Sequence, residues 1–486
     1  MNDSTNTREN LSILRSIGPA LITACVVFGP GSLIISANVG ANYGYDLLWL
    51  LVLTGVLMGT FMTMSARVGV TAGATHFATL RKEVGAWLAA LAGVVLCLVC
   101  AAFQFSNNLA VSLVAAAVVP EDRSEMVFPA QFIAMAVLNG LLIVFLFRAQ
   151  QVYKAVERIM KFMVGVVLLS FLFSLLVALP DLRAWAAGMV VLLVTLLAVR
   201  QSGSANERVL RILLALAIVP LLVTLVVLSP PLQAMLKGFI PWLPEGVQLG
   251  FPRIVDGELA DPMVLLASLV GTTFSVAGAF FQGNLVREKG WTVQDYDRGV
   301  GDAIAGVCVL TCVSMMIMLT AGTVILGEPA SNIATLAMTL QPLLGRTAFV
   351  VFCIGLIPIA LNPFLINAMI GGTALADGLG LPGRFSDFWP RMFTIFVLLI
   401  GFVVATIGLY FDIPAVNLMI FGQAMTVIGN PLLAAIILWL ANRKSILGER
   451  RNRIASNLLG VIGLTVVILL TIRMLWFLSL RISLLL

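Results

Sequence analysis

Long apolar segments recur along the chain and are separated by short polar ones. A helix of about 20 apolar residues is long enough to cross the hydrocarbon core of a bilayer. We therefore expect an all-α integral membrane protein with a single transmembrane domain over residues 1–486, of which 1–16 form a polar N-terminus. About 13 spans are predicted, at residues 17–41, 46–69, 85–119, 129–148, 154–179, 184–201, 207–229, 262–285, 299–325, 345–374, 391–409, 413–441 and 456–479.

Two of these apolar segments are interrupted. The first contains Gly-Pro-Gly-Ser at 29–32, and the second, at 265–286, contains a run of small and hydroxylated residues at 271–278. Unpaired backbone groups in hydrocarbon cost several kcal/mol each, so broken helices persist where they line a cavity. Small residues also favour a tight helix crossing, which is the alternative for the second segment. Because each segment comes first in its half of the chain, we predict a binding site between them in an inverted-repeat transporter.

A further repeat lies in the middle of the chain. Pro180 recurs as Pro230 and Gly188 as Gly238, a spacing of 50 residues, and a Glu-Arg pair recurs at the same spacing. Chance similarity between apolar segments is the alternative, but matched charges, proline and glycine favour a duplication. We predict that residues 129–179 and 184–229 form two copies of a helical hairpin. The second inverted repeat is predicted at 262–441, and the last span at 456–479.

Composition supports the membrane assignment and suggests an orientation. Hydrophobic residues make up 60% of the chain and charged residues 11%, and the mean hydropathy is +1.06, far from the values of soluble proteins. Most of the 29 Lys and Arg residues fall on one side of the predicted spans, which makes that side, with the N-terminus, cytoplasmic. The net charge of +6 then reflects topology. We expect a lipid bilayer as partner, no nucleic acid, and a prokaryotic inner membrane.

Few residues suit catalysis or metal binding. No nucleophile–base pair, phosphate-binding loop or metal-ligand spacing accompanies the helices, so we expect neither an enzyme nor a cofactor. The single histidine, His76, is predicted as an interfacial or loop residue rather than a ligand. Cys97 and Cys100 have the spacing of a redox pair, but their apolar helix favours packing. No charged residue or histidine lies near the middle of a predicted span, whereas membrane proton relays depend on such residues.

Three segments carry recognisable motifs: residues 18–69, residues 361–380 with Gly-Gly-Thr-Ala at 371–374, and residues 423–432 with Asn-Pro-Leu at 430–432. They resemble the first two helices, the eighth helix and the tenth helix, respectively, of the Nramp family of divalent-metal and proton transporters. The resemblance implies a leucine-transporter-type fold, which is an inverted repeat of five plus five helices. In this fold the first and sixth core helices are broken and hold the substrate between them.

The chain departs from the family where the family binds metal and protons. The family motif Asp-Pro-Gly-Asn is Gly-Pro-Gly-Ser here, at 29–32, and Met-Pro-His aligns with Ser-Val-Ala at 275–277. Gln104 and Asn107 stand where the third helix of the family carries acidic residues of the proton path. The resemblance thus implies a substrate site without a metal-binding set, whose candidate residues are Val26, Gly29, Gly31, Ser32, Thr272, Ser275, Ala277, Gly278 and Gln423.

Neutral carbonyl, hydroxyl and amide groups are too weak to strip water from a divalent cation in a low-dielectric site. The smaller side chains also predict a wider pocket, toward which half-helices beginning near Ser32 and Gly278 direct the positive ends of their dipoles. We therefore predict transport of a larger neutral or anionic substrate, such as a chelated metal (for example a ferric chelate), without the proton coupling typical of the family.

Other functions remain open at this point. A transporter of a hydrated hard cation such as magnesium is one alternative, although such an ion benefits from a carboxylate in its outer shell. A non-transporting membrane sensor would also explain the altered site, and an amino-acid or organic-cation carrier is compatible with the fold. The sequence leaves the oligomeric state open and is compatible with a monomer.

Overall fold

The computed structural model describes residues 29–148, 231–244, 250–255, 258–261, 263–288, 290–328, 335, 348–384 and 386–485. Within these residues, eight helices are long and apolar enough to cross a membrane, which confirms an all-α integral membrane protein. The polar segment 1–16 and most of the duplicated hairpin, including the predicted spans at 154–179, 184–201 and 207–229, lie outside the described residues. The total number of spans stays a prediction.

The first half of the described chain is built from four long helices. Thr75 accepts a hydrogen bond from the Ala78 N–H and so caps the short helix that joins the second of them to the third. Gly44, with φ 58°, ends the first helix in a conformation that favours glycine. The elements are α3 (Pro30–Tyr43), α4 (Leu48–Thr71), α5 (His76–Glu83), α6 (Ala86–Val118), the 3-10 helix η1 (Glu121–Met126) and α7 (Val127–Arg148).

The second half begins with a short helix and a two-stranded antiparallel hairpin, in which Ile254 lies opposite Leu259. Thr292 and Asp295 form a capping box that starts α14, the 32-residue helix that follows the broken one. The elements are α11 (Leu232–Lys237), β1 (Arg253–Val255), β2 (Glu258–Ala260), α12 (Val264–Thr273), α13 (Val276–Glu288), α14 (Val293–Val324), α17 (Ala348–Leu379), α18 (Phe388–Tyr410), α19 (Ala415–Met425), η3 (Thr426–Gly429), α20 (Asn430–Asn442), α21 (Lys444–Leu447), η4 (Gly448–Arg450) and α22 (Ile454–Leu485).

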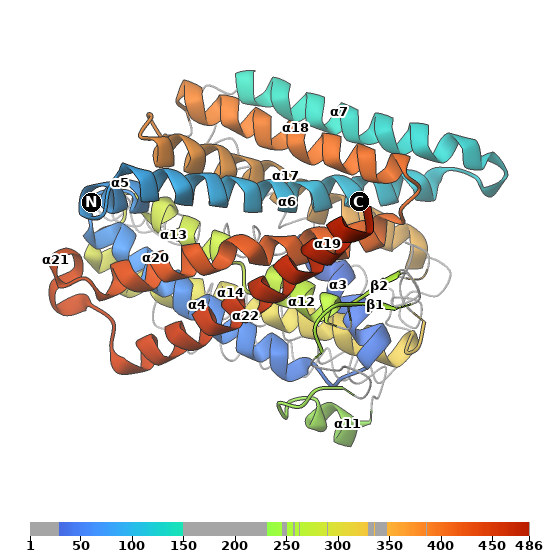
Figure 1. Ribbon diagram of the computed structural model, residues 1–486, viewed down its shortest axis with the longest axis horizontal. Helices are drawn as coiled ribbons and strands as arrows, with labels where there is room; N and C mark the ends of the chain where they lie inside the picture. The colour runs from blue at the N-terminus through green and yellow to red at the C-terminus, as the bar shows by residue number, and fades with distance from the viewer. Residues whose placement is uncertain are drawn as a thin grey trace, which may run out of the picture.

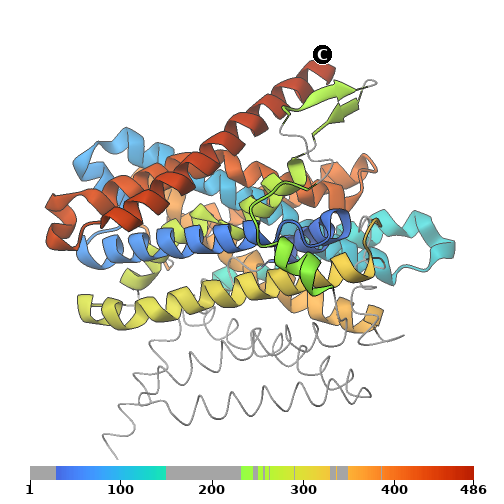
Figure 2. The same ribbon diagram turned by 90° about the horizontal axis from the view of Figure 1, so that it is seen from below.

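Helices of the two halves pack on each other in a reciprocal way. The first half runs α3, α4, α6, and the second runs α12–α13, α14, α17. The second helix of each half packs on the first of the other, α4 on α13 and α14 on α3, and the third helices α6 and α17 pack together (Figure 1). Figure 2 shows α14 running alongside α3 and α4. This reciprocity is expected of an inverted repeat with a pseudo-two-fold axis.

Each of these three crossings places a glycine against the backbone of the partner helix. A Cβ atom at Gly69 of α4 would lie 2.7 Å from the carbonyl carbon of Gly283 in α13. A Cβ atom at Gly93 of α6 would lie 2.9 Å from Cα of Gly378 in α17, and one at Gly40 of α3 would overlap the backbone of α14. Small residues allow such close approach, which favours helix association in a membrane. A tight helix crossing, which is the alternative explanation for the small residues at 271–278, is therefore what the small residues at these three crossings produce.

Apolar side chains are exposed along the outer helices α7, α18 and α22. Phe147, Val403 and Leu469 are 58%, 47% and 62% exposed. In Figure 1, α7 and α18 lie along the upper edge of the molecule, where α18 packs on α6 and α17. An exposed apolar surface of this extent is unfavourable in water but suits contact with lipid. The exposed faces of these helices therefore suit contact with lipid.

The expectation that no charged residue lies near the middle of a span is wrong for α22. Arg473 lies about one helical turn from the midpoint of this helix and is 6% exposed. It forms a buried ion pair with Asp261 and also donates a hydrogen bond to the Gly250 carbonyl. Because a buried charge without a partner costs several kcal/mol, this pair ties α22 to the segment that enters α12.

We expect Gly69→Ala to destabilise the fold, because the added methyl group would overlap the Gly283 backbone and force α4 and α13 apart. Overpacking of this kind costs about 1–3 kcal/mol. Thermal unfolding in detergent should therefore show a lower midpoint. The control is Gly59→Ala in the same helix, where a Cβ atom meets nothing within 4 Å. Equal midpoints for the two variants would contradict the packing described here.

Candidate functional site

The first interrupted segment enters the described chain at Gly29. This residue is the N-cap of α3, with an extended backbone of φ −105° and ψ 175°, and Pro30 occupies the first turn. Proline is favoured there because its missing N–H would have no intrahelical partner. The half-helix thus begins two residues before the predicted start near Ser32, which is buried in its first turn. Val26 lies outside the described residues.

The second interruption separates α12 from α13. Helix α12 ends at Thr273 and α13 begins at Val276, so the break falls on Phe274 and Ser275. Ser275 Oγ accepts a hydrogen bond from the Gly278 N–H at 3.2 Å and caps the second half-helix. The structure therefore confirms a broken helix at this position, with its second half starting two residues before the predicted Gly278.

Hydroxyl groups before this break are turned toward their own helix. Thr272 and Thr273 both donate to the Leu269 carbonyl, at 3.0 and 2.6 Å. Both side chains are buried, and their oxygens still have lone pairs for a second partner. Ala277, after the break, is buried and has no polar side-chain atom. This wall of the site consequently offers weak, neutral acceptors.

Gln423 of α19 lies where α3, α12 and α19 meet. Its Cδ atom is 2.8 Å from the place of a Cβ atom at Gly31, and its backbone oxygen is 2.6 Å from the place of one at Gly271. The residue is 3% exposed, and Oε1 has no hydrogen-bond partner in the described part of the chain. The sequence predicts a wider pocket here, but on the Gly31 side the Gln423 side chain fills the space.

Gln104 and Asn107, which the resemblance aligns with the proton path of the family, have different surroundings. Asn107 is 2% exposed, and its Oδ1 lies 3.8 Å from the place of a Cβ atom at Gly29. Gln104 is fully buried against α18, where Gly401 leaves room for it. Among the described residues, neither polar atom of the Gln104 side chain has a partner, nor has Asn107 Nδ2. The structure brings Asn107 to the site and leaves Gln104 beside α18.

Two residues adjoin the site that the sequence analysis does not identify. Pro363 Cγ of α17 lies 3.4 Å from the place of a Cβ atom at Gly29, and Gly271 packs on the Gln423 backbone. A proline inside an apolar span marks an irregular helix, and Gly271 opens the small-residue run. Both signals are visible in the sequence, but neither indicates which helix the residue faces.

Donors around the site do not form a metal centre. Within the described residues, no group of three His, Cys, Asp or Glu side chains is placed to hold a metal ion. Cys97 and Cys100 are buried, free thiols in the core of α6, in agreement with a packing role. The surroundings of Gly29 offer an amide and a proline ring instead. This arrangement can accept or donate hydrogen bonds but supplies no negative charge.

The prediction that His76 is an interfacial or loop residue is wrong. His76 is the first residue of α5 and is fully buried between α4 and α13. Its ring lies on Phe280, with 4.9 Å between centroids, and fills the place that a side chain at Gly283 would need. Burial lowers its pKa from 6.5 to about 4, while Asn284 acts in the opposite direction. Sequence reasoning missed this because α5, although polar, turns one face toward the core.

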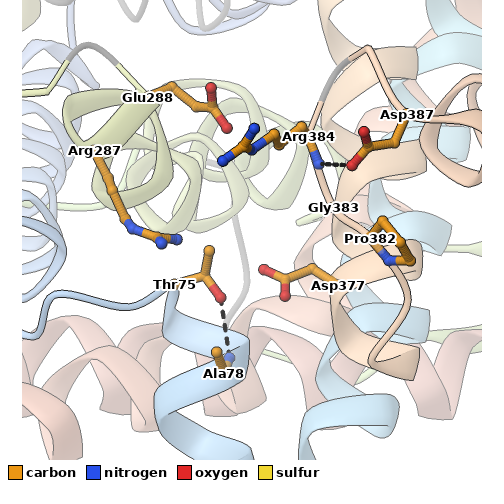
Figure 3. A pocket seen from close by; sticks show the side chains of 9 residues that line it. All are labelled: Thr75, Ala78, Arg287, Glu288, Asp377, Pro382, Gly383, Arg384 and Asp387. Carbon is orange, nitrogen blue, oxygen red and sulfur yellow. Dashed lines mark hydrogen bonds between the residues drawn. The ribbon is translucent and has the colours of Figure 1, made fainter.

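A charged pocket of about 770 Å³ lies where α5 meets the end of α13. Figure 3 shows Arg287 and Glu288 reaching it from α13, Thr75 from α5, and Asp377 and Arg384 from α17 and the loop beyond. A half-helix of 13 residues, roughly 20 Å long, separates this pocket from Ser275. Since cations and anions share the pocket, we regard it as a separate feature of the α5 end and not as the predicted site.

The chain matches the family described as "Natural resistance-associated macrophage protein-like" (Nramp) over residues 20–194 and 185–477. It is 21% identical over 469 residues to the divalent metal cation transporter MntH of Yersinia pestis, covering 94% of this chain and 93% of that protein. It is 22% identical over 476 residues to MntH of Deinococcus radiodurans, covering 96% and 90%. Similarity therefore extends over nearly the whole chain.

Solved structures show the same fold. The Eremococcus coleocola manganese transporter in complex with an aromatic bis-isothiourea compound has a TM-score of 0.64 at 14% identity, over 97% of this chain and 87% of that one. Mhp1, a nucleobase-cation-symport-1 family transporter with bromovinylhydantoin bound, has a TM-score of 0.51 at 11% identity, over 95% and 92%. The leucine-transporter-type inverted repeat is thereby confirmed.

We expect Gly31→Ala and Gly271→Ala to differ in their effect on stability. A methyl group at Gly31 meets the flexible end of Gln423, which can rotate away, whereas one at Gly271 meets the Gln423 backbone. Thermal unfolding should leave Gly31→Ala near the parent and lower the midpoint of Gly271→Ala, because overpacking costs about 1–3 kcal/mol. A large loss of stability in Gly31→Ala would show that the Gln423 side chain is fixed.

Proposed function

Because the chain belongs to the Nramp family of membrane metal transporters, we propose that it carries a metal as a complex with an organic ligand, for example a ferric chelate. The observation that supports this proposal is the environment of Gly29. Asn107 and Pro363 are the closest side chains to its Cβ position, and neither is anionic. A complex that brings its own metal ligands needs none from the protein.

A bare divalent cation would be poorly held by these residues. Transition metals prefer imidazole, thiolate or thioether ligands, and burial of an uncompensated charge is strongly unfavourable. Ser275 Oγ already accepts from Gly278, and the Thr272 hydroxyl donates within α12. What these residues offer are lone pairs of a few neutral oxygens, which do not replace the hydration shell of a dication.

Donors at the site favour a neutral or anionic cargo. Helices α3 and α13 both begin beside it, at Pro30 and Val276, and helix N-termini favour negative charge. Asn107 Nδ2 is a buried donor without a partner in the described residues. A carboxylate of an organic ligand would satisfy this group, whereas a bare cation would leave it unpaired.

The fold is compatible with an organic cargo. Mhp1, which has this fold, was solved with bromovinylhydantoin bound, although a shared fold alone does not define a substrate. In this chain the Gln423 side chain stands where cargo would reach Gly31. Because it is the end of a flexible side chain, a change of its rotamer would open that space. We therefore propose that the Gln423 side chain borders the site and changes its rotamer to admit the cargo.

Transport is proposed to proceed without the proton coupling typical of the family. Gln104 and Asn107 carry amides, which do not titrate, at the positions of the proton path. Arg473, which lies near the centre of α22, is paired with Asp261. We further propose a prokaryotic inner membrane and a cytoplasmic N-terminus, on the basis of the positive-inside rule.

A hydrated hard cation such as magnesium is a second candidate. Asn107 Oδ1 adjoins Gly29, and Gln423 Oε1 is a buried acceptor without a partner in the described residues. Amide oxygens suit the outer shell of a hard, hydrated cation. Because the described side chains closest to the Gly29 Cβ position include no carboxylate, we rank a hydrated cation below the chelated metal as the cargo.

Proteoliposomes should take up radiolabelled ferric citrate and should not take up bare Mn²⁺, Cd²⁺ or Fe²⁺. We expect Gly29→Asp to lower citrate-complex uptake about tenfold or more, which corresponds to 1.4 kcal/mol, because the carboxylate would repel an anionic cargo. Gly301→Asp is the control, since a side chain at Gly301 meets nothing within 4 Å. Robust uptake of bare Mn²⁺ would contradict the proposal, and uptake of Mg²⁺ alone would favour the second candidate.

Coupling is measured in the same vesicles with a trapped pH indicator. Under an imposed membrane potential, we expect ferric citrate uptake without acidification of the lumen, because amides replace the titratable groups of the proton path. Protein-free vesicles give the background leak. Acidification that depends on both substrate and protein would show that a proton crosses with the cargo.

A further inference from the structure

His76 lies at the crossing that positions the second half-helix of the candidate site. It is the one histidine of the chain and is fully buried. Its ring fills the space beside Gly283 in the middle of α13, whose first turn contains the candidate residues Ala277 and Gly278. A change in the charge of this imidazole would therefore act on the helix that forms one wall of the site.

The hydrogen bonds of Ser65 determine which ring nitrogen carries the proton. Ser65 Oγ donates to the Phe280 carbonyl at 3.0 Å and accepts from the Gly283 N–H at 3.2 Å. A hydroxyl has one proton and two lone pairs, so its contact with His76 Nε2 at 3.2 Å must be an acceptance. His76 is thus assigned as the neutral tautomer with the proton on Nε2 and a lone pair on Nδ1.

With this tautomer, two buried acceptor atoms, one on His76 and one on Asn284, have no hydrogen-bond donor among the described residues. Neither His76 Nδ1 nor Asn284 Oδ1 has a hydrogen-bond partner in the described part of the chain. Asn284 nevertheless raises the pKa of His76, because its side chain can accept a hydrogen bond from the charged ring. Unpaired buried polar atoms are costly. One added proton on Nδ1 would satisfy both.

Charged groups on the surrounding helices do not cause the shift in the pKa of His76. The helices packed against α5 are α6, α13 and α17, and Ser65 of α4 contacts the His76 ring. Helix α6 has no charged residue, and the causes of the shift in the pKa of His76 are burial and Asn284. The charged or titratable side chains nearest along these elements are Arg67, Arg81, Lys82, Glu83, Arg287, Glu288 and Asp377. Protonation therefore depends on solvation of the ring and on Asn284.

We propose that His76 is a proton-binding site, in which Nδ1 takes up a proton and donates the new N–H to Asn284 Oδ1. The proton arrives when α13 separates from α4 and water reaches the ring. When the helices close again, desolvation expels it to the same side of the membrane. The site makes the position of α13 depend on pH without moving a proton across the bilayer.

Linkage gives the direction of this effect. The pKa of His76 is about 4 in the closed structure and 6.5 for a solvated histidine. A group whose pKa is lowered by burial stabilises the closed form fully above its solvated pKa. This contribution is lost as the pH falls from 6.5 toward 4. Acidic conditions should thus favour separation of α13 from α4.

Selective ¹⁵N-histidine labelling tests the proposal in the full chain, purified with a tag free of histidine, and needs no substrate. Because the chain has one histidine, one imidazole reports. At pH 7.5 we expect a neutral ring with the proton on Nε2. Asn284→Asp should raise the half-titration pH by at least one unit, since a carboxylate stabilises the charged ring. Asn442→Asp, in an exposed amide pair with Asn457, is the matched control and should leave it unchanged.

A proton on Nδ1 at pH 7.5, or a half-titration pH equal in Asn284→Asp and the parent, would overturn the proposal. Should Asn284→Asp not fold, Asn284→Ala removes the acceptor and is expected to lower the half-titration pH. Hydrogen exchange adds an independent readout. After correction for intrinsic exchange, α13 amides should exchange faster at pH 5 than at pH 7.5 in the parent but not in His76→Gln. Equal pH dependence in both would exclude His76 as the responsive group.

Discussion

The contact between α4 and α13 is the interaction on which the rest of the core depends. Gly69 and Gly283 bring the two backbones together, and Ser65 joins them through hydrogen bonds to α13. This contact holds a half-helix of 13 residues whose start is in the candidate site and whose end is in the charged pocket. It therefore fixes the direction in which α13 leaves the break at Phe274 and Ser275.

Small residues at 29–32 and 271–278 do not by themselves create a cavity. Gly31 and Gly271 leave room that Gln423 occupies, because interiors are close-packed and a neighbouring long side chain can enter a gap. At Gly29, by contrast, the nearest neighbours are a proline ring and an amide at ordinary contact distance or beyond. The two glycines of the first motif thus differ. Gly31 adjoins the flexible Gln423 side chain, whereas a side chain at Gly29 would fit beside Pro363 and the buried Asn107 amide.

The apolar spans of the described residues, the break between α12 and α13 and the family could be predicted from the sequence, because long apolar runs and interruptions by small and hydroxylated residues are local signals. The break at Ser275 lies where the small-residue run indicates. Contacts between helices that are distant in the sequence could not be predicted, because they depend on which helices pack together. The burial of His76 requires Gly283 from a segment 207 residues away in the chain, and the pairing of Arg473 requires Asp261. Neither partner can be identified from periodicity within one helix.

The ion pair between Arg473 and Asp261 also has a consequence in time. The two residues are 212 positions apart, and Arg473 belongs to the last helix. During synthesis, the acidic residue at the entrance to α12 is made long before its counter-ion, and an uncompensated charge is expensive beside a membrane. The segment that enters α12 therefore acquires its counter-ion only after α22 has been made. The order in which the helices are synthesised thus leaves α12 with an unpaired carboxylate at its entrance until α22 packs beside it.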